Sequence, residues 1–188
     1  MSPRADAVRN RQKLLDAAMR LFAEEGIDVP LDRIAKAAGV SIGTLYNNFP
    51  DRGALLDELL PERLAELERL AAVSAAEPDP WTGFAGFVEA MFAGQAGDRA
   101  ANEAMSRGPL GDVDLMAECG RSGSAVRSVL DRAHAAGAVR ADFAYDDLAA
   151  LMVAVAAVIH ASPGDDRRWR RHLHFHLDGI RARRGSDA

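Results

Sequence analysis

The sequence predicts an all-α protein, and three observations support that prediction. Apolar residues recur at the three- and four-residue spacing of an amphipathic helix along almost the whole chain. Alanine is abundant and all but two of the 23 basic residues are arginine, and both residue types rank among the best helix formers. No segment of useful length alternates apolar and polar residues as a half-buried strand does.

Length and composition bound the class of protein. A chain of 188 residues fits one domain, or a small domain and a larger one. The net charge of −5 argues against a protein that coats nucleic acid by bulk charge. The lone cysteine, Cys119, excludes a disulfide framework and a cysteine-built zinc site. The sequence has neither a long apolar run nor a signal peptide, so we expect a cytoplasmic protein.

The first half of the chain predicts four helices. They cover residues 9–25, 31–38, 42–48 and 51 to about 75, and Pro61 predicts a kink or a break in the fourth. Helical spacing stops around residues 77–80, where two prolines make the best linker. We therefore expect a domain over residues 1–56, a connecting helix to about residue 75, and a second domain over 77–184.

The second half predicts five more helices, separated by glycine- and proline-containing loops. A loop is expected at 94–98, which contains Gly94 and Gly97, and another at 108–111. The helices are expected at residues 81–93, 99–106, 114–136, 145–161 and 167–183.

Residues 31–52 have the spacing of a helix-turn-helix, in which a short helix, a glycine turn and a capped second helix follow one another. Gly39 permits the left-handed backbone that the turn needs, and Ser41 is a good N-cap for the second helix. Ile34, Val40 and Leu45 would form a small core that sets the angle between the helices.

The outward face of the second helix is polar, uncharged and rich in hydrogen-bonding groups. Asn and Thr side chains read base edges, and a Tyr hydroxyl reaches phosphate, while Gly43 would let the backbone approach the duplex. The predicted DNA-binding residues are Arg33, Ser41, Gly43, Thr44, Tyr46, Asn47, Asn48 and Arg52. The alternative is a helix-turn-helix that serves only for packing.

Residues 39–52 (GVSIGTLYNNFPDR), preceded by LLDAAMRLFAEEG at 14–26, resemble the DNA-binding domain of the TetR family of transcriptional regulators. The resemblance covers about residues 9–56. It implies a three-helix DNA-binding domain, and a larger helical domain that binds a ligand and dimerises. It also implies that Thr44, Tyr46 and Asn48 contact DNA and that Arg52 grips a phosphate. Asn48 stands where the family most often has His and Arg52 where it most often has Lys, yet both can still donate to phosphate. The stretch from Leu130 to the end resembles the SbtR-type C-terminal group.

Charge is distributed unevenly along the chain. Residues 1–52 carry eight basic and seven acidic side chains, whereas residues 53–188 carry 15 basic and 21 acidic ones. Arg4, Arg9, Arg11 and Lys13 gather where the first helix begins and could reach the DNA backbone or a minor groove. A solvated helix face is the other interpretation of this cluster.

Aromatic and methionine residues follow one another from residue 81 onward and could line an adaptable apolar pocket. The ligand-binding candidates are Trp81, Phe84, Phe87, Met91, Phe92, Met105, Met116, Cys119 and Met152. Gln95, Asn102 and His160 are possible polar contacts. For each apolar residue taken alone an ordinary core is the favoured interpretation, and the pocket is predicted mainly because the resemblance implies one.

The last two predicted helices each carry an apolar stripe. The resemblance implies a homodimer through a four-helix bundle made by these helices, and such an interface is apolar and obligate. The predicted interface residues are Ala149, Met152, Val153, Ala156, His160, Leu173, His176, Leu177 and Ile180. The alternative is that the stripes form the core of the monomer.

No enzyme, cofactor or metal is expected. The sequence has no phosphate-cradling glycine loop, HExxH motif or nucleophile elbow. His172 and His176 share a helix face while His174 points away, and without a carboxylate at the right spacing they make a weak zinc site.

The sequence therefore predicts a homodimeric regulator that binds double-stranded operator DNA, most simply a repressor released by a small-molecule effector. The alternative is a helical sensor or carrier with a vestigial helix-turn-helix.

Overall fold

The computed structural model describes residues 3–107 and 115–182, with the side chains at positions 3, 4, 60, 64, 104–107 and 115–122 excepted. The prediction of an all-α fold is confirmed, because these residues form helices joined by short connections. The helices are α1 (Pro3–Glu25), α2 (Leu31–Ala38), α3 (Ile42–Asn48), α4 (Arg52–Ala76), α5 (Pro80–Ala96), α6 (Arg99–Arg107), α7 (Leu115–Ala135), α8 (Tyr145–Ala161) and α9 (Asp166–Ile180).

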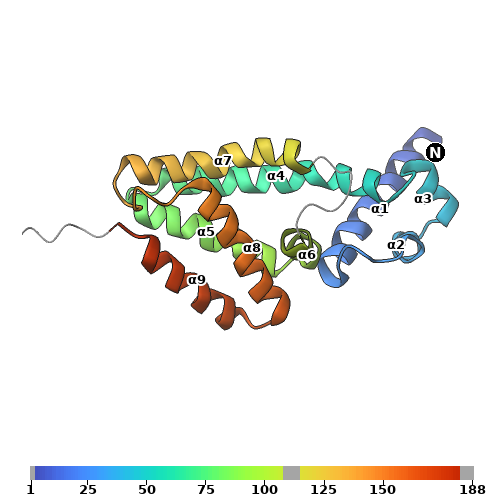
Figure 1. Ribbon diagram of the computed structural model, residues 1–188. Coiled ribbons are helices and arrows are strands. Elements are labelled where there is room, and N and C mark those ends of the chain that lie inside the picture. The colour runs from blue at the N-terminus through green and yellow to red at the C-terminus, as the bar shows by residue number, and fades with distance from the viewer. Residues whose placement is uncertain (1–2, 108–114, 183–188) are drawn as a thin grey trace, which may run out of the picture.

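The helices gather in two groups joined by α4 (Figure 1). Helices α1, α2 and α3 pack together at one end, and α4 runs from them into the other group, where it packs against α5 and α7. Helices α8 and α9 lie on the far side of α5. Helix α6 lies at the junction and contacts α1 as well as α5 and α8.

Each group of helices has its own hydrophobic core. The first core includes Leu14, Phe22, Ile34, Leu45, Phe49 and Leu55, all completely or almost completely buried. The second core includes Phe84, Phe92, Leu148, Trp169 and Leu173. Burying such side chains contributes about 1.5–3 kcal/mol each, so each helix group is stabilised mainly by its own apolar stripes.

Helix α1 begins at Pro3, six residues before the predicted start. Proline is favourable in the first turn of a helix because its fixed φ suits the helix and its missing N–H would have no partner there. The extension brings Arg9 and Asp6 onto the same helix, where they form an ion pair.

Helix α4 continues through Pro61, so the prediction of a break there is wrong. Proline removes one hydrogen bond, which leaves the carbonyl of Asp57 without its helical donor. Both Pro61 and Asp57 are exposed, and water can therefore satisfy that carbonyl. Packing of α4 against α5 and α7 on its other side maintains the helix.

Helix α5 extends to Ala96, past the loop predicted to begin at Gly94. Its penultimate residue Gln95 is buried and donates from Nε2 to Oδ1 of Asn102 in α6 at 3.0 Å. This tertiary contact outweighs the modest helix-breaking preference of one glycine.

Helix α9 ends at Ile180, three residues before the predicted end. Arg181 turns to an extended conformation and forms a β-bridge with Val139. The N–H of Arg140 donates to the carbonyl of Ile180, and the N–H of Ala182 donates to that of Ala138, both at 3.0 Å. These bonds to the α7–α8 connection replace the helical bonds that a longer α9 would make.

Candidate nucleic-acid interface

The turn between α2 and α3 is built by one glycine and one serine, as predicted. Gly39 adopts φ 69° and ψ 32°, and its N–H and that of Val40 close the end of α2 on the carbonyls of Lys36 and Ala35. Ser41 then begins α3, because its hydroxyl accepts a hydrogen bond from the N–H of Thr44 at 3.1 Å. The local sequence therefore sets both the left-handed turn and the start of the second helix.

The core beneath the turn also follows the predicted pattern. Ile34 and Leu45 are completely buried and Val40 is half-buried. Ala35 and Ala38 are buried too, and their small side chains allow α2 and α3 to approach closely. Buried residues on one face of α3 leave its other face to solvent.

The solvent-facing side of α3 carries the predicted polar set. Tyr46 is 51% exposed, Gly43 and Asn47 are exposed, and Thr44 and Asn48 are half-buried. The hydroxyls of Ser41 and Thr44 lie 2.9 Å apart, and Asn48 Nδ2 donates to the carbonyl of Thr44 at 2.7 Å. A Cβ placed on Gly43 would meet nothing closer than the Ser41 hydroxyl at 3.9 Å, so the backbone there is open to a partner.

One further residue on this face was not predicted as a contact. Ile42 is 41% exposed at the beginning of α3. Its apolar side chain is of the kind that contacts a thymine methyl group. Its position directly after the N-cap is the sequence signal that could have identified it.

Arg52 contacts the backbone of the segment between α1 and α2. Its guanidinium is half-buried and donates from Nη1 to the carbonyls of Ile27 and Val29, the latter at 2.7 Å. These carbonyls belong to the connector between α1 and α2, defined here as residues 26–30. Arg52 therefore holds the connector through one of its nitrogens, and its contact with a phosphate stays a prediction.

The other basic residues near α3 divide into paired and unpaired ones. Arg33 forms an ion pair with Glu25 at 2.5 Å, and Arg11 pairs with Glu58 at 2.7 Å while its guanidinium lies over the Phe49 ring. The hydrogen bond from Arg11 lowers the pKa of the Glu58 carboxyl. Lys13 and Lys36 are exposed and make no ion pair among the described residues. These two lysines are therefore available to phosphate.

Six of the predicted ligand-binding residues lie in the second core or pack against it. Phe84, Phe87, Met91 and Phe92 are buried, and Trp81 and Met152 pack against them half-buried. Gln95 and Asn102 are buried and bonded to each other, while His160 is exposed. The side chains of Met105, Met116 and Cys119 lie outside the described residues.

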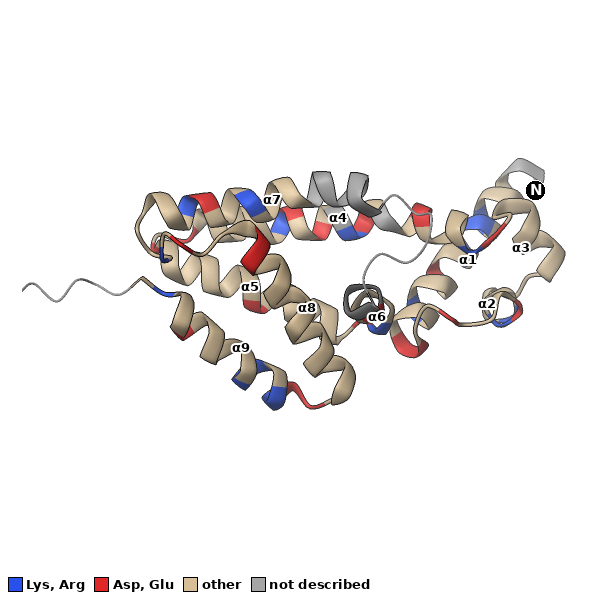
Figure 2. Cartoon of the chain, viewed as in Figure 1, with Lys and Arg blue, Asp and Glu red and all other residues tan. Residues whose placement is uncertain are grey.

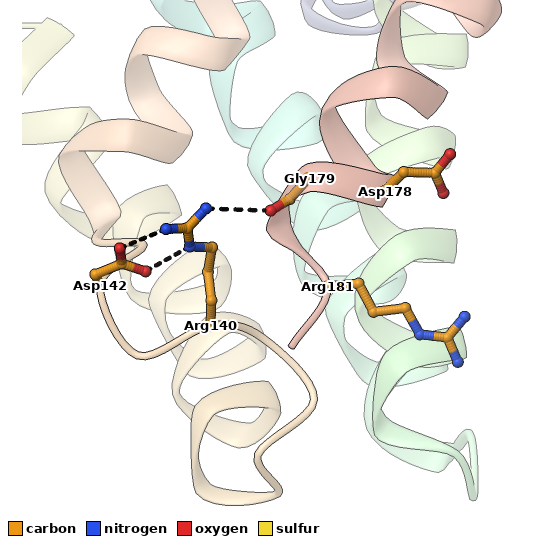
Figure 3. A pocket seen from close by; sticks show the side chains of 5 residues that line it. All are labelled: Arg140, Asp142, Asp178, Gly179 and Arg181. Carbon is orange, nitrogen blue, oxygen red and sulfur yellow. Dashed lines mark hydrogen bonds and ion pairs between the residues drawn. The ribbon is translucent and has the colours of Figure 1, made fainter. Parts of the chain in front are cut away.

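Two cavities in the described part of the chain lie away from these residues. One of about 450 Å³ lies beside the C-terminal end of α9 and is lined by Arg140, Asp142, Asp178, Gly179 and Arg181 (Figure 3). Arg140 spans part of it, pairing with Asp142 and donating to the carbonyl of Gly179. A second, of about 320 Å³, includes Met19, Leu59 and Arg63 beside α4. Neither contains a residue of the predicted apolar pocket.

The predicted dimer residues separate into two sets. Ala156, Leu173, Leu177 and Ile180 are buried within the single chain, the last three of them in the second core. Their spacing could not distinguish an inner stripe from an outer one. Ala149, Val153, His160 and His176 are exposed and Met152 is half-buried. Phe175, which was not predicted, is 61% exposed.

His172 and His176 meet on one flank of α9. Their Nε2 atoms lie 3.2 Å apart and their ring centroids 4.6 Å apart. Burial, and then the charge of His172, lower the pKa of His176.

Among the described residues, no helix has the length and apolar character that crossing a bilayer requires.

Comparison with known proteins covers both helix groups. Residues 14–59 match the family model described as bacterial regulatory proteins, tetR family. Residues 79–182 match the model of the SbtR-like transcriptional regulator C-terminal domain. The first match spans most of the first helix group and the start of α4, and the second match spans α5 to α9.

Individual relatives agree with these models. The TetR transcriptional regulator SCO0520 from Streptomyces coelicolor is 33% identical, with 93% of this chain and 99% of that one covered and a TM-score of 0.62. A TetR transcription regulatory protein from Mycobacterium vanbaalenii is 30% identical, with 96% and 99% covered and a TM-score of 0.57. The HTH-type transcriptional regulator SAB2452 from Staphylococcus aureus is 45% identical over 53 residues, which are 28% of this chain and 29% of that relative. The chain thus matches less than a third of the length of this curated relative. The family models and the two structures together show that the chain belongs to the TetR family of bacterial transcriptional regulators.

Proposed function

We propose that the protein is a homodimeric repressor that binds operator DNA through α3 and is released from it by a small-molecule effector. The observation that carries this proposal is the exposed face of α3, where Tyr46, Asn47 and Gly43 project from a helix held in place by the first core. Two large side chains, Ile42 and Tyr46, are held exposed on this helix of seven residues, and a DNA groove would cover both.

The docking follows from helix-turn-helix geometry. Helix α3 enters the major groove, and α2 crosses the backbone above it. Thr44 and Asn48 reach base edges, Ile42 adds an apolar contact, and Lys36 at the end of α2 lies among the groups available to phosphate. Two copies place their α3 helices in half-sites about one helical turn, roughly 34–36 Å, apart.

The dimer uses the outer faces of α8 and α9. Val153 on α8 and Phe175 on α9 are 48% and 61% exposed, and a dimer through these faces would remove both apolar side chains from water. Beyond its first turn, α8 bears no charged residue other than histidine (Figure 2), as the centre of an interface requires. A two-fold axis beside these helices would pair each face with its own copy.

Coupling between effector and DNA runs through α6. Glu103 of α6 is 3% exposed, and its Oε2 accepts from the N–H of Ile27 in the connector at 3.2 Å, while Arg99 donates to Oε1. Arg52 holds the same connector from the α4 side. A Cβ on Gly26 would lie 2.6 Å from the Glu103 carboxylate, and Gly26 adopts φ 97°, so the contact requires glycine. A shift of α6 therefore moves the connector, and with it α2 and α3.

Release is a shift of population between two arrangements of the dimer. An effector that binds the second helix group favours a spacing of the α3 helices that no longer fits the operator. Effector and DNA must then weaken each other's binding by the same factor.

The test is a mobility-shift titration of the purified protein on the DNA upstream of its own gene, at several salt concentrations. We expect a discrete complex that survives excess nonspecific competitor and weakens steeply as salt rises, because phosphate contacts release counterions. Absence of specific retardation at low salt would contradict the proposal. It would favour the sensor or carrier with a vestigial helix-turn-helix.

A further inference from the structure

We propose that His172 and His176 form a binding site for a divalent transition-metal ion of the kind that prefers imidazole, such as Ni²⁺, Cu²⁺ or Zn²⁺. This site is separate from the DNA-binding face and does not depend on it. It rests on the two Nε2 atoms that meet on the flank of α9.

The distance between the two nitrogens fits a shared ion. Metal–nitrogen bonds of about 2.0–2.1 Å that join two nitrogens 3.2 Å apart enclose an angle of about 100–106° at the metal. That angle lies between the octahedral and the tetrahedral values. The rings can thus chelate one ion with little movement of the helix.

The helix holds the pair in this position. Trp169, Leu173 and Leu177 anchor α9 in the second core, and residues four apart lie one above the other on a helix. His172 is half-buried, His176 is exposed, and α9 lies at the outer edge of its helix group (Figure 1). In the single chain the site is therefore preorganised and open to solvent.

The ligand set selects the class of metal. Two neutral imidazoles without a carboxylate or thiolate favour Cu²⁺, Ni²⁺ and Zn²⁺ over Mg²⁺ and Ca²⁺, which prefer oxygen ligands. Among the described residues, no third His, Cys, Asp or Glu joins the pair to make a group suited to a metal ion. Water, or the same pair from a second copy, must complete the coordination.

A hydrogen bond from one neutral ring to the other is the competing explanation of the short distance. It requires one Nε2 to carry a proton, whereas chelation requires both lone pairs. The two explanations differ in whether an added metal ion binds.

The experiment is isothermal titration calorimetry, in which Ni²⁺ is added to full-length protein that carries no histidine tag. Mg²⁺ is the comparison ion. His172→Gln and His176→Gln remove one ligand each while keeping a polar side chain. His174→Gln is the matched control, because His174 lies on the same helix, is exposed and points away from the pair. Circular dichroism confirms that each variant is folded.

We expect the wild-type protein and His174→Gln to bind Ni²⁺ equally, and either pair variant to bind at least about tenfold more weakly, because the second ligand acts at a high effective concentration. One ion per chain would mean that water completes the site, and one per two chains that the partner's pair does; both support the proposal. Absence of Ni²⁺ binding, equal binding by the pair variants, or an equal loss in His174→Gln would overturn it.

Discussion

Arg52 of α4 and Glu103 of α6 both hold the connector between α1 and α2. Arg52 donates to the carbonyls of Ile27 and Val29, and Glu103 accepts from the N–H of Ile27. Two carbonyls and one N–H of the connector are thus bonded to charged side chains from other helices. Such charge-assisted bonds are stronger than neutral ones, so they fix where α2 begins.

Removing the Arg52 side chain should cost more stability than removing a comparable arginine from the surface. We expect Arg52→Ala to lower the free energy of unfolding by about 1–3 kcal/mol, because the carbonyls lose a charged donor. Arg33→Ala, which breaks a pair whose arginine is 58% exposed, should cost less than about 1 kcal/mol. Chemical denaturation of both variants measures the difference. Equal losses would show that Arg52 does not support the connector.

Contacts within a short segment could be predicted from the sequence, and contacts between distant segments could not. The roles of Gly39 and Ser41 depend on their neighbours alone, and the structure agrees with the prediction for both. Arg52 resembles a phosphate-binding residue in the linear pattern. Its partners lie 23 and 25 positions earlier, and nothing in the local sequence reveals the path of the connector.

Helix α3 is short and depends on its ends and its packing. A helix of seven residues is not stable alone in water, so the Ser41 cap and the buried Leu45 maintain it. The longer helices illustrate the opposite case. Helix α4 passes through Pro61 and α5 through Gly94, because packing along a long helix outweighs one unfavourable residue. Sequence signals for breaks are therefore weaker in helices that have extensive tertiary contacts.

Two substitutions at Ser41 separate its role as a cap from its role at the DNA surface. Ser41→Ala should lower the free energy of unfolding by about 0.5–2 kcal/mol, since the N–H of Thr44 loses its acceptor. Ser41→Asp should retain the cap and the stability. Its added charge should weaken operator binding by about fivefold through repulsion from phosphate. Thermal unfolding and a DNA-binding titration check the two effects. Unchanged DNA binding by folded Ser41→Asp would place this end of α3 away from the duplex.

The whole molecule combines a nearly neutral helix-turn-helix region, residues 1–52, with an acidic body, residues 53–188. Residues 1–52 carry one more basic than acidic side chain, while the remainder is strongly acidic. An acidic body repels the duplex wherever α3 does not face it, which lowers nonspecific affinity relative to specific affinity. The negative total charge is therefore compatible with a protein that relies on a few placed contacts.

The sequence could not predict which faces of α8 and α9 turn toward the core. Both helices carry apolar residues on more than one face, and periodicity alone cannot say which stripe turns inward. Leu173 and Leu177 are buried in the second core, whereas Val153 and Phe175 remain in solvent. Only the positions of α5 and α8 around α9 decide between them.

Recognition of operator DNA by α3 is tested most directly by fluorescence anisotropy, with a labelled duplex from the region upstream of the gene. Tyr46→Ala and Thr44→Ala should each weaken binding by about 5- to 150-fold, the effect of losing a contact worth about 1–3 kcal/mol. Val73→Ala, which changes a 71% exposed residue of α4, should bind like the wild-type protein. If folded Tyr46→Ala and Thr44→Ala proteins bind the duplex as tightly as the wild type, α3 does not read the operator.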